Sequence, residues 1–120
     1  MLMEGAAVKV TIHLNEDTSS NKDFLHKEIL SFLYDEGVSG ASLVKLLSGF
    51  GSHHQIHTEG ADWNAGEHLP IRIEFIEAPD RAARILPKLC ALVTDGMVEI
   101  QDTRILKNTM KKQAEGQTGS

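Results

Sequence analysis

The chain has 120 residues and a formal net charge of −5, and its acidic and basic side chains are interspersed along the sequence. This length allows one domain with a hydrophobic core. The charge pattern argues against a nucleic-acid binder or a protein held on an anionic membrane surface. No apolar run reaches the roughly 20 residues that a membrane-spanning helix needs, so we expect no membrane-embedded segment.

The single cysteine, Cys90, has no partner for a disulfide within the chain. It lies in an apolar helical pattern, which predicts a position in the core. A chain without disulfides is typical of a reducing compartment, and residues 1–6 lack the positive and apolar regions of a signal peptide. We therefore expect a cytoplasmic protein.

Two elements are predicted in the first third of the chain. Apolar and polar residues alternate over residues 7–14, which indicates a strand. A polar loop follows, in which Ser20 or Asn21 is expected to cap a helix. Apolar residues then recur at i, i+4, i+7 and i+8 over residues 25–33, the spacing of one buried helical stripe. Gly37 suits the left-handed position after the end of this helix.

A second strand is predicted over residues 41–48, where Val44 alternates with Lys45. Residues 49–68 follow no regular period and read as a long loop, and loops of this length are usually functional or mobile. A third strand begins at Pro70, a position where the missing N–H of proline needs no partner. The loop is therefore the longest irregular part of the predicted domain.

The last third of the chain predicts a helix, a strand and a tail. Pro79 and Asp80 favour the start of the helix, and Pro87 inside its apolar stripe is expected to kink it. Residues 97–105 alternate as a fourth strand. Residues 107–120 are polar, and we expect a disordered C-terminal tail there.

The predicted order of strand, helix, strand, strand, helix and strand indicates an α+β, ferredoxin-like fold, with a four-stranded antiparallel sheet and two helices on one face. The apolar strand residues, Val98 and Ile100 among them, are expected to lie under the helices. The opposite face should carry polar residues: Lys9, Thr11, His13, Lys45, Arg72, Glu74, Glu99 and Gln101. Such a face lies in water or lines the polar interior of an oligomer.

The most unusual stretch lies where the second strand ends, because Gly49, Phe50 and Gly51 precede a polar segment rich in histidine. The glycines let the backbone approach a partner closely, and the aromatic ring can pack against a flat ligand. Three histidines follow, and they are solvated loop residues, contacts to a phosphate or a base, or metal ligands: His53, His54 and His57. Trp63 lies far from any apolar run, and three interpretations are open: it docks onto the domain, it docks onto a partner, or it packs within the loop.

No pattern of catalytic residues stands out. Ser52 directly precedes His53, and neighbours in a loop do not align a nucleophile, a base and an orienting acid. Glu77 and Asp80 flank a helix start, where the helix dipole explains carboxylates. We therefore expect a binding protein rather than an enzyme.

Four segments resemble the PII-like family known as domain of unknown function 190, namely Val10–Asp17, Gly37–Ala41, Gly49–His53 and Leu86–Leu89. The Gly-Phe-Gly-Ser-His stretch after the second strand is the most specific of them. The resemblance covers the chain from about residue 8 to residue 106, so we expect one PII-like domain over residues 7–106. The wider relatives are the PII signalling proteins and the CutA-type proteins.

The resemblance implies a homotrimer that binds a ligand in clefts between subunits. In PII proteins the loop after the second strand contacts target proteins, and its Gly-Phe-Gly-Arg-Gln base helps hold ATP or ADP. Carried over to this chain, the resemblance assigns ligand binding to Gly49, Phe50, Gly51, Ser52, His53, Asp95 and Gly96. It assigns contact with a target protein to loop 51–68, with His54, His57 and Trp63.

Two positions depart from the PII pattern. Ser52 and Met97 stand where PII proteins carry an arginine and a lysine that hold phosphates. Each charged hydrogen bond contributes about 1.5–3 kcal/mol, so we expect weak binding of an adenine nucleotide or a preference for a ligand with less phosphate than ATP. A protonated His53 would restore part of this attraction, and binding should strengthen from pH 8 to pH 6.

Two functions from different classes remain open at this point. The first is a regulatory protein that senses a small anionic metabolite or nucleotide and contacts a target protein through its long loop. The second is a CutA-like protein that binds a divalent metal through His53, His54 and His57. Titration with adenine nucleotides and with zinc or copper would separate them.

Overall fold

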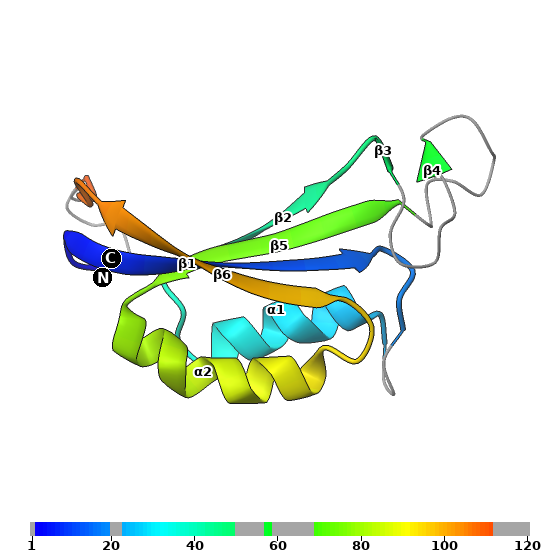
Figure 1. The fold of residues 1–120 in the computed structure, drawn as a ribbon, viewed down its shortest axis with the longest axis horizontal. Helices are drawn as coiled ribbons and strands as arrows, with labels where there is room; N and C mark the ends of the chain where they lie inside the picture. The colour runs from blue at the N-terminus through cyan, green and yellow to red at the C-terminus, as the bar shows by residue number, and fades with distance from the viewer. Residues whose placement is uncertain (1, 20–22, 50–56, 59–68, 112–120) are drawn as a thin grey trace, which may run out of the picture.

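The computed structural model describes residues 2–19, 23–49, 57–58 and 69–111. Its elements run along the chain as β1 (Gly5–Asn15), α1 (Leu25–Asp35), β2 (Ala41–Lys45), β3 (Ser48–Gly49), β4 (His57–Thr58), β5 (Pro70–Glu77), α2 (Pro79–Leu92) and β6 (Met97–Ile105). Four strands form an antiparallel sheet in the order β2-β5-β1-β6. Both helices cover one face of this sheet (Figure 1). The predicted ferredoxin-like α+β fold is confirmed.

The core lies between the sheet and the helices, as strand alternation requires. Residues paired across antiparallel strands point to the same face. In the register of β1 and β5, Val10 faces Phe75 and Ile12 faces Ile73, and all four are buried. The cluster is completed by apolar residues of β1, β5 and both helices: Leu14, Leu25, Ile29, Leu33, Ile71, Ile85 and Leu89.

The ends of α1 follow one prediction and contradict another. Gly37 takes a φ of 80°, the left-handed conformation expected after the helix. The N-cap is Phe24 and not Ser20 or Asn21, and its side chain makes no capping hydrogen bond. Asp23 instead accepts a hydrogen bond from the Phe24 N–H at 2.7 Å. Ser20 and Asn21 lie outside the described residues.

The second predicted strand is shorter than expected and its faces are reversed. The main-sheet strand β2 ends at Lys45, and β3 starts only at Ser48. We call the sheet face turned away from the helices the open face. In the register, Val44 pairs with Arg72 of this open face, whereas Lys45 pairs with buried Ile71. Placing Lys45 on the open face was therefore wrong, because a shift of one residue exchanges the two faces of a strand. Its ammonium group lies 3.5 Å from the Glu16 carboxylate beyond the end of β1.

Two residues that the sequence places in the core are exposed. Cys90 lies one position after buried Leu89 on α2, and it points to solvent, since one residue turns a helix by about 100°. Ile100 is on the helix-facing side of β6, opposite Val10, yet it remains 52% exposed. As β6 is the edge strand, the helices leave this position uncovered.

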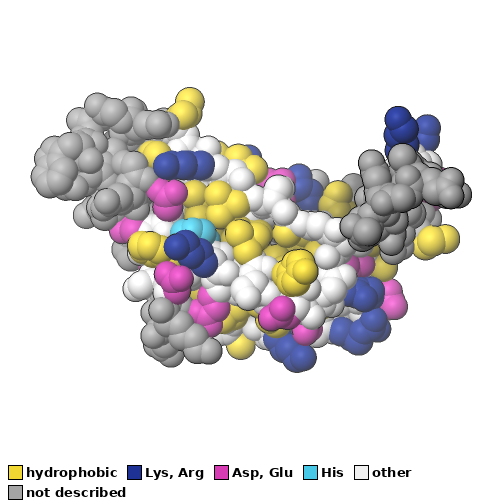
Figure 2. Space-filling model, turned by 180° about the vertical axis from the view of Figure 1, so that it is seen from behind, with side chains coloured by type: hydrophobic (Ala, Val, Ile, Leu, Met, Phe, Trp, Pro, Cys, Tyr) yellow, Lys and Arg dark blue, Asp and Glu magenta, His cyan; other side chains and the backbone are white. Residues whose placement is uncertain are grey.

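The second helix runs without interruption from Pro79 to Leu92, with Pro87 inside it. Among the described residues, no helix is long and apolar enough to cross a membrane. The surface mixes acidic and basic side chains around smaller apolar areas, as the face in Figure 2 shows. The segment after β6 is held by a hydrogen bond of 2.7 Å from the Asn108 amide to the Leu2 carbonyl. The prediction of a disordered tail over residues 107–120 is not tested beyond residue 111.

Candidate functional site

The base of the long loop forms a short ribbon that the sequence did not predict. Strands β3 and β4 pair antiparallel, with Ser48 opposite Thr58 and Gly49 opposite His57. This backbone pairing fixes the point where the chain leaves the sheet and the point to which it returns. Six of the predicted site residues lie outside the described residues: Phe50, Gly51, Ser52, His53, His54 and Trp63.

The second predicted piece of the site is the turn between α2 and β6, which contains Asp95 and Gly96. Gly96 has a φ of +157°, and a Cβ atom built on it would lie 2.6 Å from the backbone oxygen of His13. The end of β1 therefore passes too close for any side chain at this position. Asp95 beside it is exposed. The glycine is needed for the fold itself, whether or not a ligand approaches the turn.

The loop base and the turn lie at opposite edges of the sheet. The ribbon continues from β2, the turn leads into β6, and β5 and β1 separate these two edge strands. Three strand spacings correspond to about 14 Å. Both features are at the same end of the sheet (Figure 1). One chain alone therefore does not bring Gly49 and Asp95 to a common ligand.

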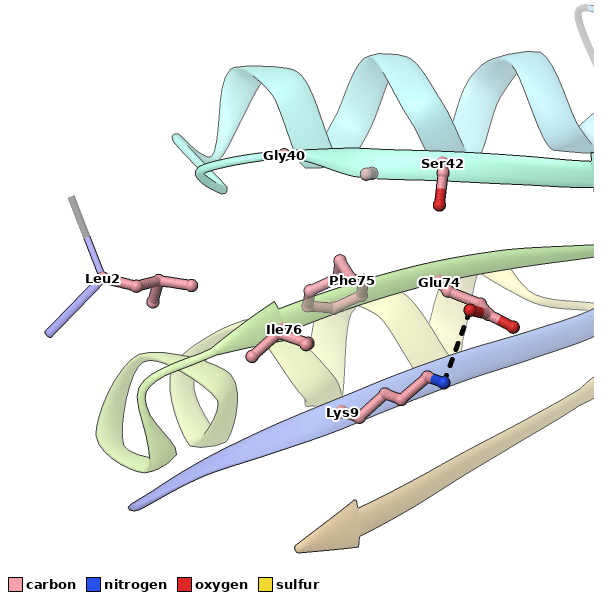
Figure 3. Close-up of a pocket in the computed structure, with 8 residues that line it drawn as sticks. Leu2, Lys9, Gly40, Ser42, Glu74, Phe75 and Ile76 are labelled. Carbon is pink, nitrogen blue, oxygen red and sulfur yellow. Dashed lines mark ion pairs between the residues drawn. The ribbon is translucent and has the colours of Figure 1, made fainter. Parts of the chain in front are cut away.

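A hollow that the sequence did not indicate lies on the open face of the sheet. Its volume is about 420 Å³, and it is lined by Leu2, Lys9, Gly40, Ala41, Ser42, Glu74, Phe75 and Ile76. Figure 3 shows Lys9 and Glu74 reaching toward one another from β1 and β5, with Ser42 extending from β2 and Leu2 closing one end. The hollow thus combines apolar walls with a hydroxyl and an ion pair.

Charged residues of the open face are paired with one another. The Glu74 carboxylate lies 3.5 Å from the Lys9 ammonium and 3.4 Å from the Arg72 guanidinium. His13 Nε2 lies 2.7 Å from Glu99 Oε1, so the predicted placement of these two residues on the same face is confirmed. The face is therefore polar but close to neutral.

Apolar residues are interspersed with these ion pairs. The register puts Val44, Ile76 and Met97 on the open face, beside Arg72, Lys9 and His13 respectively, and Met97 is 59% exposed. A neutral face with apolar patches is suited to contact with another protein surface.

The hollow and the loop base also lie far apart within one chain. Ala41 at the hollow and Ser48 at the ribbon are seven residues apart along the same edge, which corresponds to about 23 Å of extended chain. The hollow escaped sequence analysis because Leu2, one of its walls, comes from a segment with no strand or helix pattern. In the sequence, Lys9 and Glu74 are recognisable only as opposite charges. That they lie close together follows from the register of β1 and β5.

The metal alternative finds no support in the described part of the chain. There, no group of three His, Cys, Asp or Glu side chains is arranged to hold a metal ion. Of the three predicted ligands, His57 contributes its backbone to β4, while His53 and His54 lie outside the described residues. The metal hypothesis therefore stays a prediction about the loop.

Comparison with known proteins gives one family and several solved structures of similar fold. A model of the DUF190 family, described as Uncharacterized ACR, COG1993, matches residues 7–105. The UPF0166 protein MJ1524 of Methanocaldococcus jannaschii is 29% identical over 97 residues, which cover 80% of this chain and 88% of the relative.

Among solved structures, CPII from Thiomonas intermedia K12, a nitrogen regulatory PII-like protein bound to ADP, AMP and bicarbonate, superposes with a TM-score of 0.62. It is 24% identical, and the match covers 85% of this chain and 90% of CPII. The divalent ion tolerance protein CutA1 from Ehrlichia chaffeensis gives a TM-score of 0.53 at 12% identity, over 90% of this chain and 88% of CutA1. At these identities the likeness concerns the fold. The sequence match over residues 7–105 carries more, and by it the chain belongs to the DUF190 family.

Proposed function

We propose that this protein is a trimeric regulatory protein that binds a small anionic metabolite or nucleotide between its subunits and catalyses no reaction. The observation that carries the proposal is the separation of the candidate site into three places on one chain. The loop base, the turn at Asp95 and the hollow lie at different edges or ends of the sheet. A complete site then requires a second copy to supply the missing parts.

The open face is the surface through which the copies meet. Lys9 and Arg72 of this face lie next to Glu74, and Glu99 is hydrogen-bonded to His13, so burying the face leaves none of these side chains without a polar neighbour. Val44, Ile76 and Met97 supply apolar area that favours association. A threefold arrangement of such faces leaves the helices outside, where α1 and α2 already face solvent (Figure 1).

The ligand class is an adenine nucleotide with few phosphates. The hollow offers Ile76 and Leu2 as apolar contacts and Ser42 as a hydroxyl, a combination that fits a flat heterocycle. CPII, which shares the fold, is described as bound to ADP, AMP and bicarbonate. Met97 and Ser52 replace the cations of the PII pattern, so ATP gains less from its third phosphate than it does in a PII protein.

The long loop 51–68 is the part that transmits ligand binding to a target protein. It leaves the sheet at the β3–β4 ribbon, and we assign contact with a target protein to its His54, His57 and Trp63. The protein acts in the cytoplasm, because nucleotides are present there. The target is a protein, since the net charge of −5 disfavours nucleic acid.

Isothermal titration with ATP, ADP and AMP tests the ligand class. We expect ADP or AMP to bind at least as tightly as ATP, and binding to strengthen from pH 8 to pH 6 as His53 becomes protonated. Thermal-shift titration with Zn²⁺ and Cu²⁺ is the parallel measurement. Stabilisation by metal without any effect of nucleotide would contradict the proposal in favour of a CutA-like function.

A bulky side chain at Ser42 tests the hollow. Ser42 is exposed on the open face and lines the hollow, so Ser42→Trp should fill it and weaken nucleotide binding about tenfold or more, a change of at least ~1.4 kcal/mol. Ala83→Trp on the exposed surface of α2 is the matched control and should leave the affinity unchanged. Equal affinity of both variants for ADP would show that the ligand does not use the hollow.

A further inference from the structure

A second hollow lies in the helix layer, away from the open face of the sheet. It has a volume of about 440 Å³ and is lined by Asp23, Lys27, Glu28, Ser31, Phe32, Asp35 and Leu92. Phe32 and Leu92 are partly buried residues packed against the core, so they form an apolar floor. We call this feature the helix groove.

The helix groove is acidic. Its lining contains three carboxylates, those of Asp23, Glu28 and Asp35, and one cation, Lys27. The Oε2 atom of Glu28 is buried and has no hydrogen-bond partner among the described residues. A buried carboxylate oxygen favours a donor or a cation close to it. The occupant that fits has apolar side chains for the floor and positive charges for the rim.

One segment of this same chain has that chemistry. After β6, Leu106 and Met110 are 81% and 78% exposed, and the intervening chain is neither helix nor strand. Lys107 and Lys111 follow these two apolar residues and are exposed as well. No acidic residue occurs between positions 103 and 114. We call residues 106–111 the basic segment.

The two features also match in length. In an extended chain, Leu106 and Met110 are four residues apart, about 13 Å. Along α1, Lys27 and Asp35, which both line the helix groove, are eight residues apart, about 12 Å. The segment's two apolar side chains therefore span the groove, with a lysine next to each.

The segment does not reach the groove of its own chain. The Asn108 amide is hydrogen-bonded to the Leu2 carbonyl at 2.7 Å, which fixes the segment at the far end of β6. Leu92 of the helix groove lies just before the start of β6, and the eight steps along this strand correspond to about 26 Å.

We propose that the basic segment of one copy docks into the helix groove of a second copy. Leu106 and Met110 cover Phe32 and Leu92, and the lysines pair with Glu28 and Asp35. The contact uses the outer surface of the helices and is separate from the open face. It therefore adds to, and does not depend on, the proposed trimer or its nucleotide site.

Disulfide trapping tests the docking directly. In a Cys90→Ser background, one tagged chain carries Ser31→Cys in the groove and a co-expressed chain carries Met110→Cys. A disulfide forms only where the two Cα atoms come within about 4.4–6.8 Å. We expect a covalent dimer of about twice the 13.2 kDa chain mass, and none when Ala83→Cys on α2 replaces Ser31→Cys.

Equal yields from Ser31→Cys and Ala83→Cys would overturn the proposal. A single chain carrying both Ser31→Cys and Met110→Cys must likewise give mainly cross-linked dimers and larger species. A disulfide confined within that one chain would also overturn it, because the occupant would then be the chain's own segment.

Charge reversal provides a second readout that uses surface residues and spares the core. Asp35→Lys should lower the yield of the covalent dimer about 2- to 5-fold, the effect of a surface ion pair of up to ~1 kcal/mol. Lys111→Glu in the other chain should restore it. Failure of the second reversal to restore the yield would show that these two charges do not meet.

Discussion

At the scale of single residues, Gly96 leaves less room for a side chain than Gly5, Gly37 or Gly40. A Cβ atom there would meet the His13 carbonyl oxygen at 2.6 Å, and the φ of +157° disfavours side chains in any case. We expect Gly96→Ala to lower the free energy of unfolding by about 1–3 kcal/mol, the cost of a strained backbone position. Urea denaturation measures this change.

Gly40 provides the matched control. A Cβ atom at Gly40 would have no neighbour within 4 Å, and its φ is not in the left-handed range. Gly40→Ala should therefore leave stability unchanged or raise it by up to about 1 kcal/mol, since alanine restricts the unfolded chain. An equal loss in both variants would show that the contact with His13 is not the cause.

Residue positions were predictable wherever one strong pattern decided them. The alternation in β1 identified the buried Val10 and Ile12, and the position of Gly37 identified its left-handed conformation. Cys90 was misplaced because it lies one residue from buried Leu89, and Lys45 because it lies one residue from half-buried Val44; hydrophobicity alone does not resolve such a shift. The register of β2 on β5 and the phase of α2 decide these positions, and both are set by tertiary packing.

At the scale of elements, α2 contains a proline in its third turn. Pro87 removes the hydrogen bond to the Ala83 carbonyl and places its ring against that carbonyl, yet the helix continues to Leu92. We expect Pro87→Ala to raise the free energy of unfolding by about 1–3 kcal/mol, somewhat less than the full helix penalty because proline also restricts the unfolded chain. Thermal and urea unfolding check this value.

Lys88→Ala is the control for the same surface. Lys88 lies 3.8 Å from the Glu36 carboxylate and is largely exposed, so its removal should change stability by less than about 1 kcal/mol. A loss of stability in Pro87→Ala would contradict the account. It would mean that the proline ring contributes packing or rigidity that outweighs the missing hydrogen bond.

The type and order of the main elements followed from periodicity, but the β3–β4 ribbon did not. Two paired residues on each side are too few to produce a period, and the segment around them is rich in glycine and polar residues. The break at Leu46 and Leu47 was equally invisible, because two consecutive leucines extend a strand pattern as easily as they interrupt it. The lack of a regular period located the loop, whereas the pairing at its base needed the structure.

At the scale of the whole molecule, the parts of the candidate site are divided between the two edges of the sheet. Sequence alone placed Gly49 and Asp95 in one site only through family resemblance, and the sheet order puts them on opposite edges of one chain. The hollow lined by Lys9, Ser42 and Ile76 was not predicted, because its walls come from three strands and the N-terminal segment. A site distributed in this way works only when copies of the chain assemble.

Sedimentation velocity with a fluorescent adenosine diphosphate, followed at the wavelength of the dye, tests this claim most directly. The account predicts that the nucleotide sediments with a species of about three times the 13.2 kDa chain mass. On dilution, bound nucleotide should disappear together with that species. Nucleotide that sediments with the monomer, or an assembly that never carries nucleotide at saturating concentration, would contradict a site built between subunits.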